Sequence, residues 1–132
     1  MENNLLFVYG ILKRGFDADL LKYKAEFKGE AYIEGATLYR IGRGVGLRLG
    51  DSNTSAAYGE VFSVPTDRLW QWLDSIESNG LVYTRKVVPV NLFKDADGKG
   101  VAQVLDAWVY EHTYPRMVYD RPIEGGVYTY EF

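Results

Sequence analysis

Residues 5–15 have the sequence LLFVYGILKRG. The apolar run 5–9 stops at Gly10, which is typical of a short buried strand that ends in a turn. Lys13 and Gly15 then close a loop. Successive backbone N–H groups in a glycine loop can form a concave anion-binding site, although a simple tight turn produces the same pattern. The stretch therefore predicts a buried first strand followed by a loop that is a candidate binding element.

The next part of the chain has the pattern of further short strands. Strands are expected around 27–40, interrupted by Gly29 and Gly35, and at 58–64, where apolar and polar residues alternate. Residues 42–46 have glycine at every second position, and we interpret them as a flexible loop. These glycines do not have the spacing of a dinucleotide-binding motif.

A long hairpin is predicted in the second half of the chain. Residues 82–93 and 102–110 are expected to be strands joined through 94–100, and 127–132 is a candidate edge strand. The acidic connection resembles the start of a calcium-binding loop, but Lys99 stands where an oxygen ligand is required. We therefore interpret 94–100 as an ordinary turn rich in aspartate and glycine.

Two helices are predicted. Asp17 is a plausible N-cap for a short helix that reaches about Tyr23. Residues 65–67 open a clearer helix, which ends at 78–80, where asparagine or glycine can adopt the left-handed turn. Its apolar residues follow helical spacing and should form one buried stripe of Leu69, Trp72, Leu73 and Ile76.

These elements predict the fold class. Five or more strands and two helices, without regular strand–helix alternation, indicate an α+β fold. Short strands lose their exposed edges most economically by closing into a small β-barrel. The chain has 132 residues, 15% of them aromatic, and no composition shift or internal repeat, so we expect a single domain over 1–132.

Composition excludes several classes of function. The formal net charge of −3 disfavours nucleic-acid binding, and the absence of cysteine excludes disulfides and thiolate metal sites. His112 is the only histidine, which leaves little room for a histidine metal cluster. No apolar run is long enough to span a bilayer, and the first residues do not have the basic start of a signal peptide. We expect a cytoplasmic protein without membrane contact.

Glu77 is the carboxylate with the most unusual predicted position. It follows Ile76 near the C-terminus of the predicted helix, where the helix dipole is negative and apolar side chains are close. Both effects would raise its pKa and suit it to proton transfer, whereas an exposed glutamate on a fraying helix end is the plainer interpretation. Asp74 is one turn earlier, but one turn does not place two acids across a sugar bond, which disfavours a glycosidase.

Four motifs in order resemble the gamma-glutamyl cyclotransferase-like family, in particular its gamma-glutamylamine cyclotransferase type. Residues 9–15 (YGILKRG) are similar to its Tyr-Gly-Thr-Leu-Lys-x-Gly signature. Residues 73–77 (LDSIE), followed by 83–85 (YTR), resemble its Leu-Asp-x-x-Glu and Tyr-x-Arg segments. Residues 58–62 (YGEVF) and 107–110 (AWVY) resemble two of its strands, so that the resemblance covers about residues 5–115.

The resemblance implies a small mixed β-barrel flanked by two or so helices. It implies that Glu77 is the catalytic acid/base, and that the loop formed by Tyr9, Gly10, Ile11 and Leu12 holds a glutamyl head group with backbone amides. Tyr83 and Tyr114 are candidates to line the pocket. The implied reaction converts a small-molecule γ-glutamyl amine or γ-glutamyl amino acid into 5-oxoproline and a free amine, without a metal or other cofactor.

The sequence also departs from the family pattern. Ile11 replaces the usual threonine or serine, residues 47–49 replace a loop that often contains proline, and the chain after Tyr114 matches poorly. The alternative hypotheses are a non-catalytic module on the same fold that binds a small molecule or peptide, and a different amide-processing enzyme. The leaving amine and the oligomeric state are not predicted.

Overall fold

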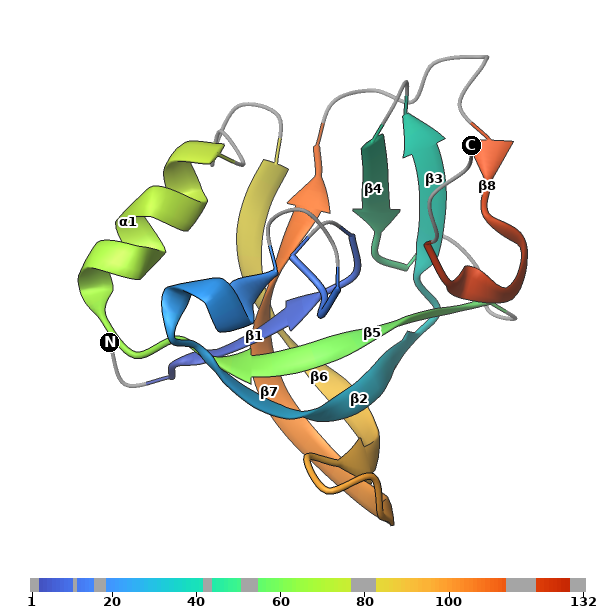
Figure 1. Ribbon diagram of the computed structural model, residues 1–132. Helices are drawn as coiled ribbons and strands as arrows, with labels where there is room; N and C mark the ends of the chain where they lie inside the picture. Colours follow the sequence, from blue (N-terminus) through green and yellow to red (C-terminus); the bar gives the residue numbers. More distant parts are fainter. Residues whose placement is uncertain are drawn as a thin grey trace.

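Five strands form a closed barrel in the computed structural model, which describes residues 3–10, 12–15, 19–41, 44–50, 55–76, 83–113 and 121–128. Their order around the barrel is β1-β5-β2-β6-β7 (Figure 1). The bounds are β1 (Leu5–Val8), β2 (Glu26–Glu34), β5 (Ala56–Ser63), β6 (Tyr83–Asp95) and β7 (Gly100–His112). Strand β1 runs antiparallel to β5 and parallel to β7, so the small mixed barrel expected from the sequence is confirmed.

The strand β1 is an apolar run because it is buried on both faces. Phe7 points into the core inside the barrel, whereas Leu6 and Val8 belong to a second core cluster together with helix α1 (Asp67–Ile76). Side chains alternate between the two faces of a strand, so β1 supplies both clusters at once. This is why its sequence does not alternate with polar residues.

A second sheet of three strands lies beside the barrel, in the order β4-β3-β8. It consists of β3 (Thr37–Ile41), β4 (Gly44–Arg48) and β8 (Arg121–Pro122). The prediction of a flexible loop over 42–46 is therefore wrong for residues 44–46, which belong to β4; residues 42–43 are outside the described ranges. The glycine at Gly46 serves close packing instead, since a Cβ there would lie 2.8 Å from the Cβ of His112.

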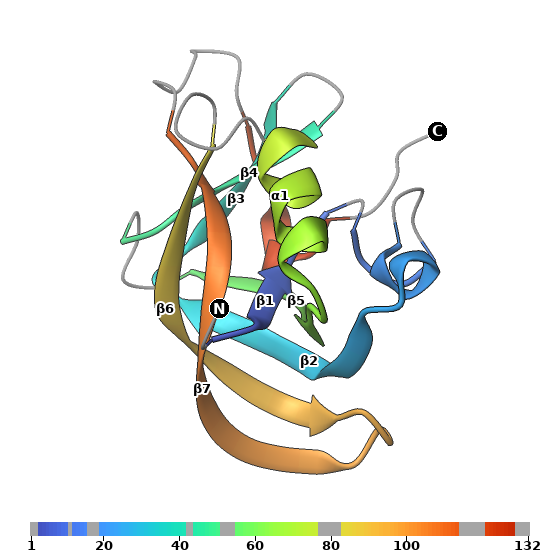
Figure 2. The ribbon, with the colours of Figure 1, turned by 90° about the vertical axis from the view of Figure 1, so that its left-hand side faces the viewer.

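Helix α1 packs across the outside of the barrel near β1 and β7 (Figure 2). The hydroxyl of Thr66 accepts a hydrogen bond of 3.1 Å from the N–H of Leu69 and caps the first turn. The predicted buried stripe needs correction: Leu69, Trp70 and Leu73 are buried, Trp72 is half-buried and Ile76 is 43% exposed. Trp70 was not predicted to be buried. It is buried because its ring packs edge-on against Trp108 of β7, whereas Ile76 is exposed.

The remaining helices are short. The 3-10 helix η1 (Leu20–Tyr23) begins after Asp19, whose side chain accepts a hydrogen bond from the N–H of Leu21. Asp17, the predicted cap, is outside the described residues. The second 3-10 helix is η2 (Glu124–Gly126). No strand includes residues 127–128 of the predicted edge strand, and the rest of that segment is not described.

The hairpin of β6 and β7 extends beyond the barrel in both views (Figures 1 and 2). Its two strands pair from Tyr83 with His112 to Lys94 with Gly100, close to the predicted bounds. Over the ranges that the structure describes, no helix has the length and apolar character needed to cross a membrane.

Candidate functional site

A cavity of about 140 Å³ opens where β1 ends. One side of it is formed by the end of the strand and the following loop, namely Phe7, Val8, Tyr9, Gly10 and Leu12. The end of the apolar run 5–9 and the glycine loop that follows it therefore line the same pocket. Their neighbour Ile11 is outside the described residues.

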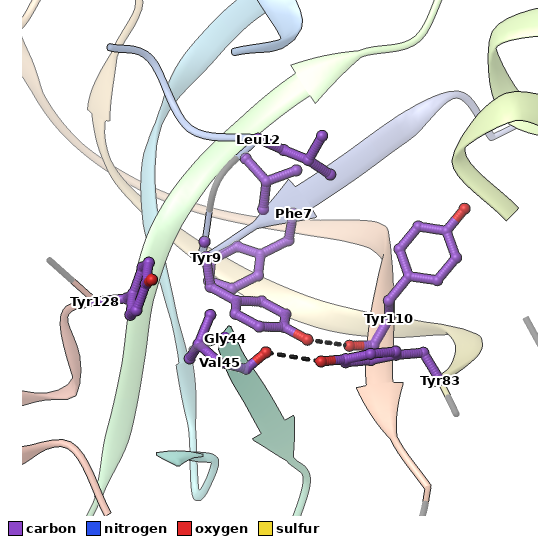
Figure 3. A pocket seen from close by; sticks show the side chains of 10 residues that line it. Phe7, Tyr9, Leu12, Gly44, Val45, Tyr83, Tyr110 and Tyr128 are labelled. Carbon is purple, nitrogen blue, oxygen red and sulfur yellow. Dashed lines mark hydrogen bonds between the residues drawn. The ribbon is translucent and has the colours of Figure 1, made fainter. Parts of the chain in front are cut away.

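The other side comes from three distant parts of the chain, which contribute Gly44, Val45, Tyr83, Tyr110 and Tyr128 (Figure 3). Strand β4 brings the first two, the hairpin brings the next two, and the segment after η2 brings the last. The pocket wall is thus mostly aromatic. Such a wall buries a ligand well and leaves few polar groups to orient it.

Two tyrosine hydroxyls hold these walls together. Tyr9 donates a hydrogen bond of 2.5 Å to the backbone carbonyl of Tyr110, and Tyr83 donates one of 2.8 Å to the carbonyl of Val45 (Figure 3). Both bonds join elements that are far apart in sequence. A buried hydroxyl with a partner stabilises its surroundings, so these rings shape the pocket with defined orientations.

The loop after β1 is held by its own backbone and by Glu60. The N–H of Lys13 donates to the carbonyl of Gly10, and the N–H of Leu20 donates to that of Leu12, at 3.0 and 3.1 Å. The carboxylate of Glu60 accepts from the backbone N–H and the side chain of Arg14, at 2.8 and 3.1 Å. These bonds fix the loop in one shape, which a binding element needs in order to be preorganised.

Gly10 is required for close packing at this loop. A Cβ on this residue would lie 2.8 Å from Cγ1 of Val45, so a larger residue would push β4 away. The glycine therefore allows the loop to approach the opposite wall of the pocket. This is a packing reason for the glycine that follows the first strand.

The helix is tied to the pocket through Asp74. Its Oδ1 accepts a hydrogen bond of 2.6 Å from the hydroxyl of Tyr110, and its Oδ2 lies 3.4 Å from the guanidinium of Arg85. The guanidinium lies over the faces of both Trp70 and Trp108, 4.7 and 4.6 Å from their centroids. The last turn of α1 is therefore anchored to a residue that lines the pocket.

The predicted site residues have different outcomes. Tyr9, Gly10, Leu12 and Tyr83 line one pocket, and their role in binding a substrate stays a prediction. The other three predicted residues, Ile11, Glu77 and Tyr114, are outside the described residues. The prediction that a buried apolar stripe reaches Ile76, the residue before Glu77, is wrong, because Ile76 is exposed.

Sequence reasoning identified four of the ten residues that line the pocket and missed the other six. Tyr110 belongs to the recognised 107–110 motif and could have been found there, but Val45 was assigned to a flexible loop and Tyr128 to an edge strand. Nothing local marks Tyr128, since only the chain's return to the barrel brings it to the pocket. No group of three potential metal-ligating side chains occurs within the residues that the structure describes.

A family model described as gamma-glutamyl cyclotransferase, AIG2-like, matches residues 6–130. No curated protein sequence matches the chain at a significant level.

Several solved structures share the fold. An AIG2-like protein from Mus musculus has a TM-score of 0.74 and 22% identity, over 96% of this chain and 88% of the mouse chain. YkqA from Bacillus subtilis has a TM-score of 0.69 and 21% identity over 96% of this chain, which spans only 39% of YkqA. The uncharacterized protein PH0828 from Pyrococcus horikoshii has a TM-score of 0.62 and 24% identity, over 93% of this chain and 87% of that one.

Proposed function

Because the chain belongs to the gamma-glutamyl cyclotransferase, AIG2-like family, we propose that it converts a γ-glutamyl amine or γ-glutamyl amino acid into 5-oxoproline and a free amine. The observation that carries this proposal is the position of the pocket. It is lined by Tyr9, Gly10 and Leu12 of the segment that resembles the family's first signature, and Tyr83 of the later motif also lines it. Two separate motifs thus share one cavity.

The proposed binding mode assigns the glutamyl head group to the loop. Backbone N–H groups of residues 9–12 would bind the α-carboxylate or the developing oxyanion. The tyrosine hydroxyls of Tyr9 and Tyr83 are engaged with backbone carbonyls, so these two side chains offer mainly their rings to the ligand. An aromatic wall of this kind excludes water and helps to hold the glutamyl chain curled.

The proposed chemistry is an intramolecular aminolysis. The α-ammonium of the glutamyl group gives a proton to Glu77, and the resulting amine attacks the γ-carbonyl carbon, forming the new C–N bond of the ring. The ring nitrogen then loses its second proton, the original γ-amide C–N bond breaks, and the departing amine takes up both protons through Glu77 and leaves as an ammonium ion. Atoms and charge balance without any further reactant. A curled substrate brings the two groups together and lowers the entropic part of the barrier.

Asp74 supports the assignment of Glu77 as the acid/base. The helix ends at Ile76, and Glu77 is the next residue in the sequence. Asp74 in the last turn is bonded to Tyr110, which lines the pocket, and to Arg85. These contacts anchor the chain immediately before Glu77 to the pocket wall, which is what a proton-transferring residue in this pocket would require.

The test is a substrate panel with mass-spectrometric detection of 5-oxoproline. The wild type, Glu77→Gln and the control Glu34→Gln, an exposed residue at the end of β2, are incubated with γ-glutamyl amines and γ-glutamyl amino acids. We expect turnover by the wild type and the control, and a loss of about 10²–10⁴-fold in Glu77→Gln, the range typical of general acid–base catalysis. Turnover by Glu77→Gln at the wild-type rate would contradict the assignment of that residue.

The same panel separates the catalytic proposal from a binding module on this fold. Calorimetric titration with each compound measures binding independently of turnover. Binding without the release of 5-oxoproline from any compound would contradict the cyclotransferase proposal and support the module. Neither binding nor turnover across the panel would contradict the γ-glutamyl ligand class itself.

A further inference from the structure

Tyr128 reaches the pocket from the far end of the chain through a tight bend. Gly125 and Gly126 have φ values of 75° and 68°, in the left-handed region that favours glycine. A Cβ on Gly126 would collide with the carbonyl oxygen of Ala56 in β5. The two glycines therefore let this segment turn against the barrel, and Tyr128 ends 2% exposed, in contact with the core.

The ammonium group of Lys13 holds the backbone of this residue. Its Nζ donates a hydrogen bond of 2.9 Å to the carbonyl oxygen of Tyr128, across 115 positions of sequence. Lys13 directly follows Leu12, which lines the pocket opposite Tyr128 (Figure 3). One hydrogen bond thus connects the proposed head-group loop with the wall on the other side of the cavity.

Burying this lysine opposes folding. Lys13 is only 8% exposed, and desolvation lowers its pKa below 10.5, although the carboxylate of Glu60 acts in the opposite direction. An apolar side chain of similar length would avoid the desolvation penalty. It would also lose the bond to Tyr128, because a thioether or alkyl group has no donor.

We infer that Lys13 is a positioning residue, which keeps Tyr128 in place as a wall of the pocket through the backbone carbonyl of Tyr128. For its effect on substrate, this inference rests on the proposed function. For its effect on the segment 121–128, it does not. Lys13 acts on the shape of the pocket and takes no part in bond making or breaking.

A specific pattern of effects follows. Replacing Lys13 with methionine removes the desolvation penalty of the buried ammonium group. We therefore do not expect the decrease in the free energy of unfolding that the loss of a core contact would cause. The segment 121–128 should nevertheless open more often, because the carbonyl of Tyr128 loses its charged donor. Substrate binding should weaken while the chemical step is preserved, which separates positioning from a general structural role.

The test compares the wild type with Lys13→Met and with the control Lys99→Met. Lys99 is an exposed lysine in the turn between β6 and β7, so this control makes the same substitution outside the pocket. Hydrogen exchange followed by mass spectrometry measures opening of 121–128, and steady-state kinetics measure KM and kcat with γ-glutamyl substrates. In Lys13→Met we expect about tenfold faster exchange of this segment and about tenfold higher KM, as loss of a charged hydrogen bond allows, with kcat changed by less than about twofold.

The outcomes are distinguishable. Unchanged exchange of 121–128 in a folded Lys13→Met protein would overturn the inference, and so would equal exchange increases in both variants. A wild type that neither binds nor turns over any γ-glutamyl compound contradicts the proposed function instead, while the exchange experiment still decides the role of Lys13. Should Lys13→Met fail to fold, Lys13→Gln, which replaces the ammonium group by a shorter neutral amide, is measured in the same way, and the same rise in exchange and KM is expected.

Discussion

The hydroxyl of Tyr110 donates a hydrogen bond of 2.6 Å to Asp74. This contact joins the pocket wall on β7 to the last turn of the only α-helix found in the described residues. Asp74 and Arg85 both belong to motifs that resemble the family pattern, and their side chains meet at 3.4 Å. Asp74 and Arg85 therefore have a structural explanation, which is to hold the helix end against the pocket.

Asp74→Ala should destabilise the protein by about 1.5–3 kcal/mol, because Arg85 loses its ion pair and Tyr110 loses a charged acceptor. Urea unfolding measures this loss, with the exposed Gln71→Ala on the same helix as a control that should be close to neutral. A double-mutant cycle with Tyr110→Phe should show a coupling energy of at least about 0.5 kcal/mol. Additive effects would mean that the hydrogen bond does not connect the two elements energetically.

Arg85→Lys should reduce stability even though the positive charge remains. The guanidinium lies over the faces of Trp70 and Trp108, whose planes are inclined by 67°, and a compact, more strongly hydrated ammonium group would lose these ring contacts. We expect a loss of about 1–2 kcal/mol, measured by thermal or urea unfolding. Arg68→Lys on the exposed face of α1 is the matched control. Equal stability of the Arg85 and Arg68 variants would rule out a contribution from stacking.

Gly46→Ala tests the close packing of β4 against β7. The added Cβ would lie 2.5 Å from Cδ1 of Ile41 and 2.8 Å from the Cβ of His112, so β4 must move away from β7. Overpacking of this kind typically costs about 1–3 kcal/mol, visible as a lower melting temperature. In Gly100→Ala, where a Cβ meets nothing within 4 Å, little change is expected. A melting temperature of Gly46→Ala as high as that of the control would show that β4 does not pack tightly here.

The stability difference between Lys13→Met and the wild type should depend on pH. The pKa of Lys13 is lower in the folded protein than its ordinary 10.5, because desolvation disfavours the charged form. Between the folded pKa and 10.5 the unfolded chain binds more protons, so wild-type stability rises with pH in this window relative to the variant. Below the folded pKa the desolvation penalty is fully present.

Urea unfolding of both proteins at several alkaline pH values measures this effect. The difference should favour Lys13→Met most at neutral pH and shift towards the wild type as pH approaches 10.5. A difference independent of pH would mean that Lys13 keeps its ordinary pKa in the folded protein.

Local patterns in the sequence were sufficient to predict the elements that are marked by an apolar run, a capping residue or a turn. The apolar run of β1, the N-terminal start of α1 and the long hairpin of β6 and β7 were predicted within a few residues. Each depends on periodicity, capping or turn residues close together in the chain. The turn at Gly10 likewise marked the loop that lines the pocket.

Only the tertiary structure decided which distant residues complete the site. Gly44–Arg48 has the composition of a loop and is a strand because β3 pairs with it and His112 packs against Gly46. Trp70 is buried in place of Ile76 because Trp108 lies beside it on the barrel. Tyr128 becomes a pocket wall because two glycines turn the chain and Lys13 binds its carbonyl. Local periodicity determines where an element forms, whereas packing between distant segments determines which of its residues are buried together.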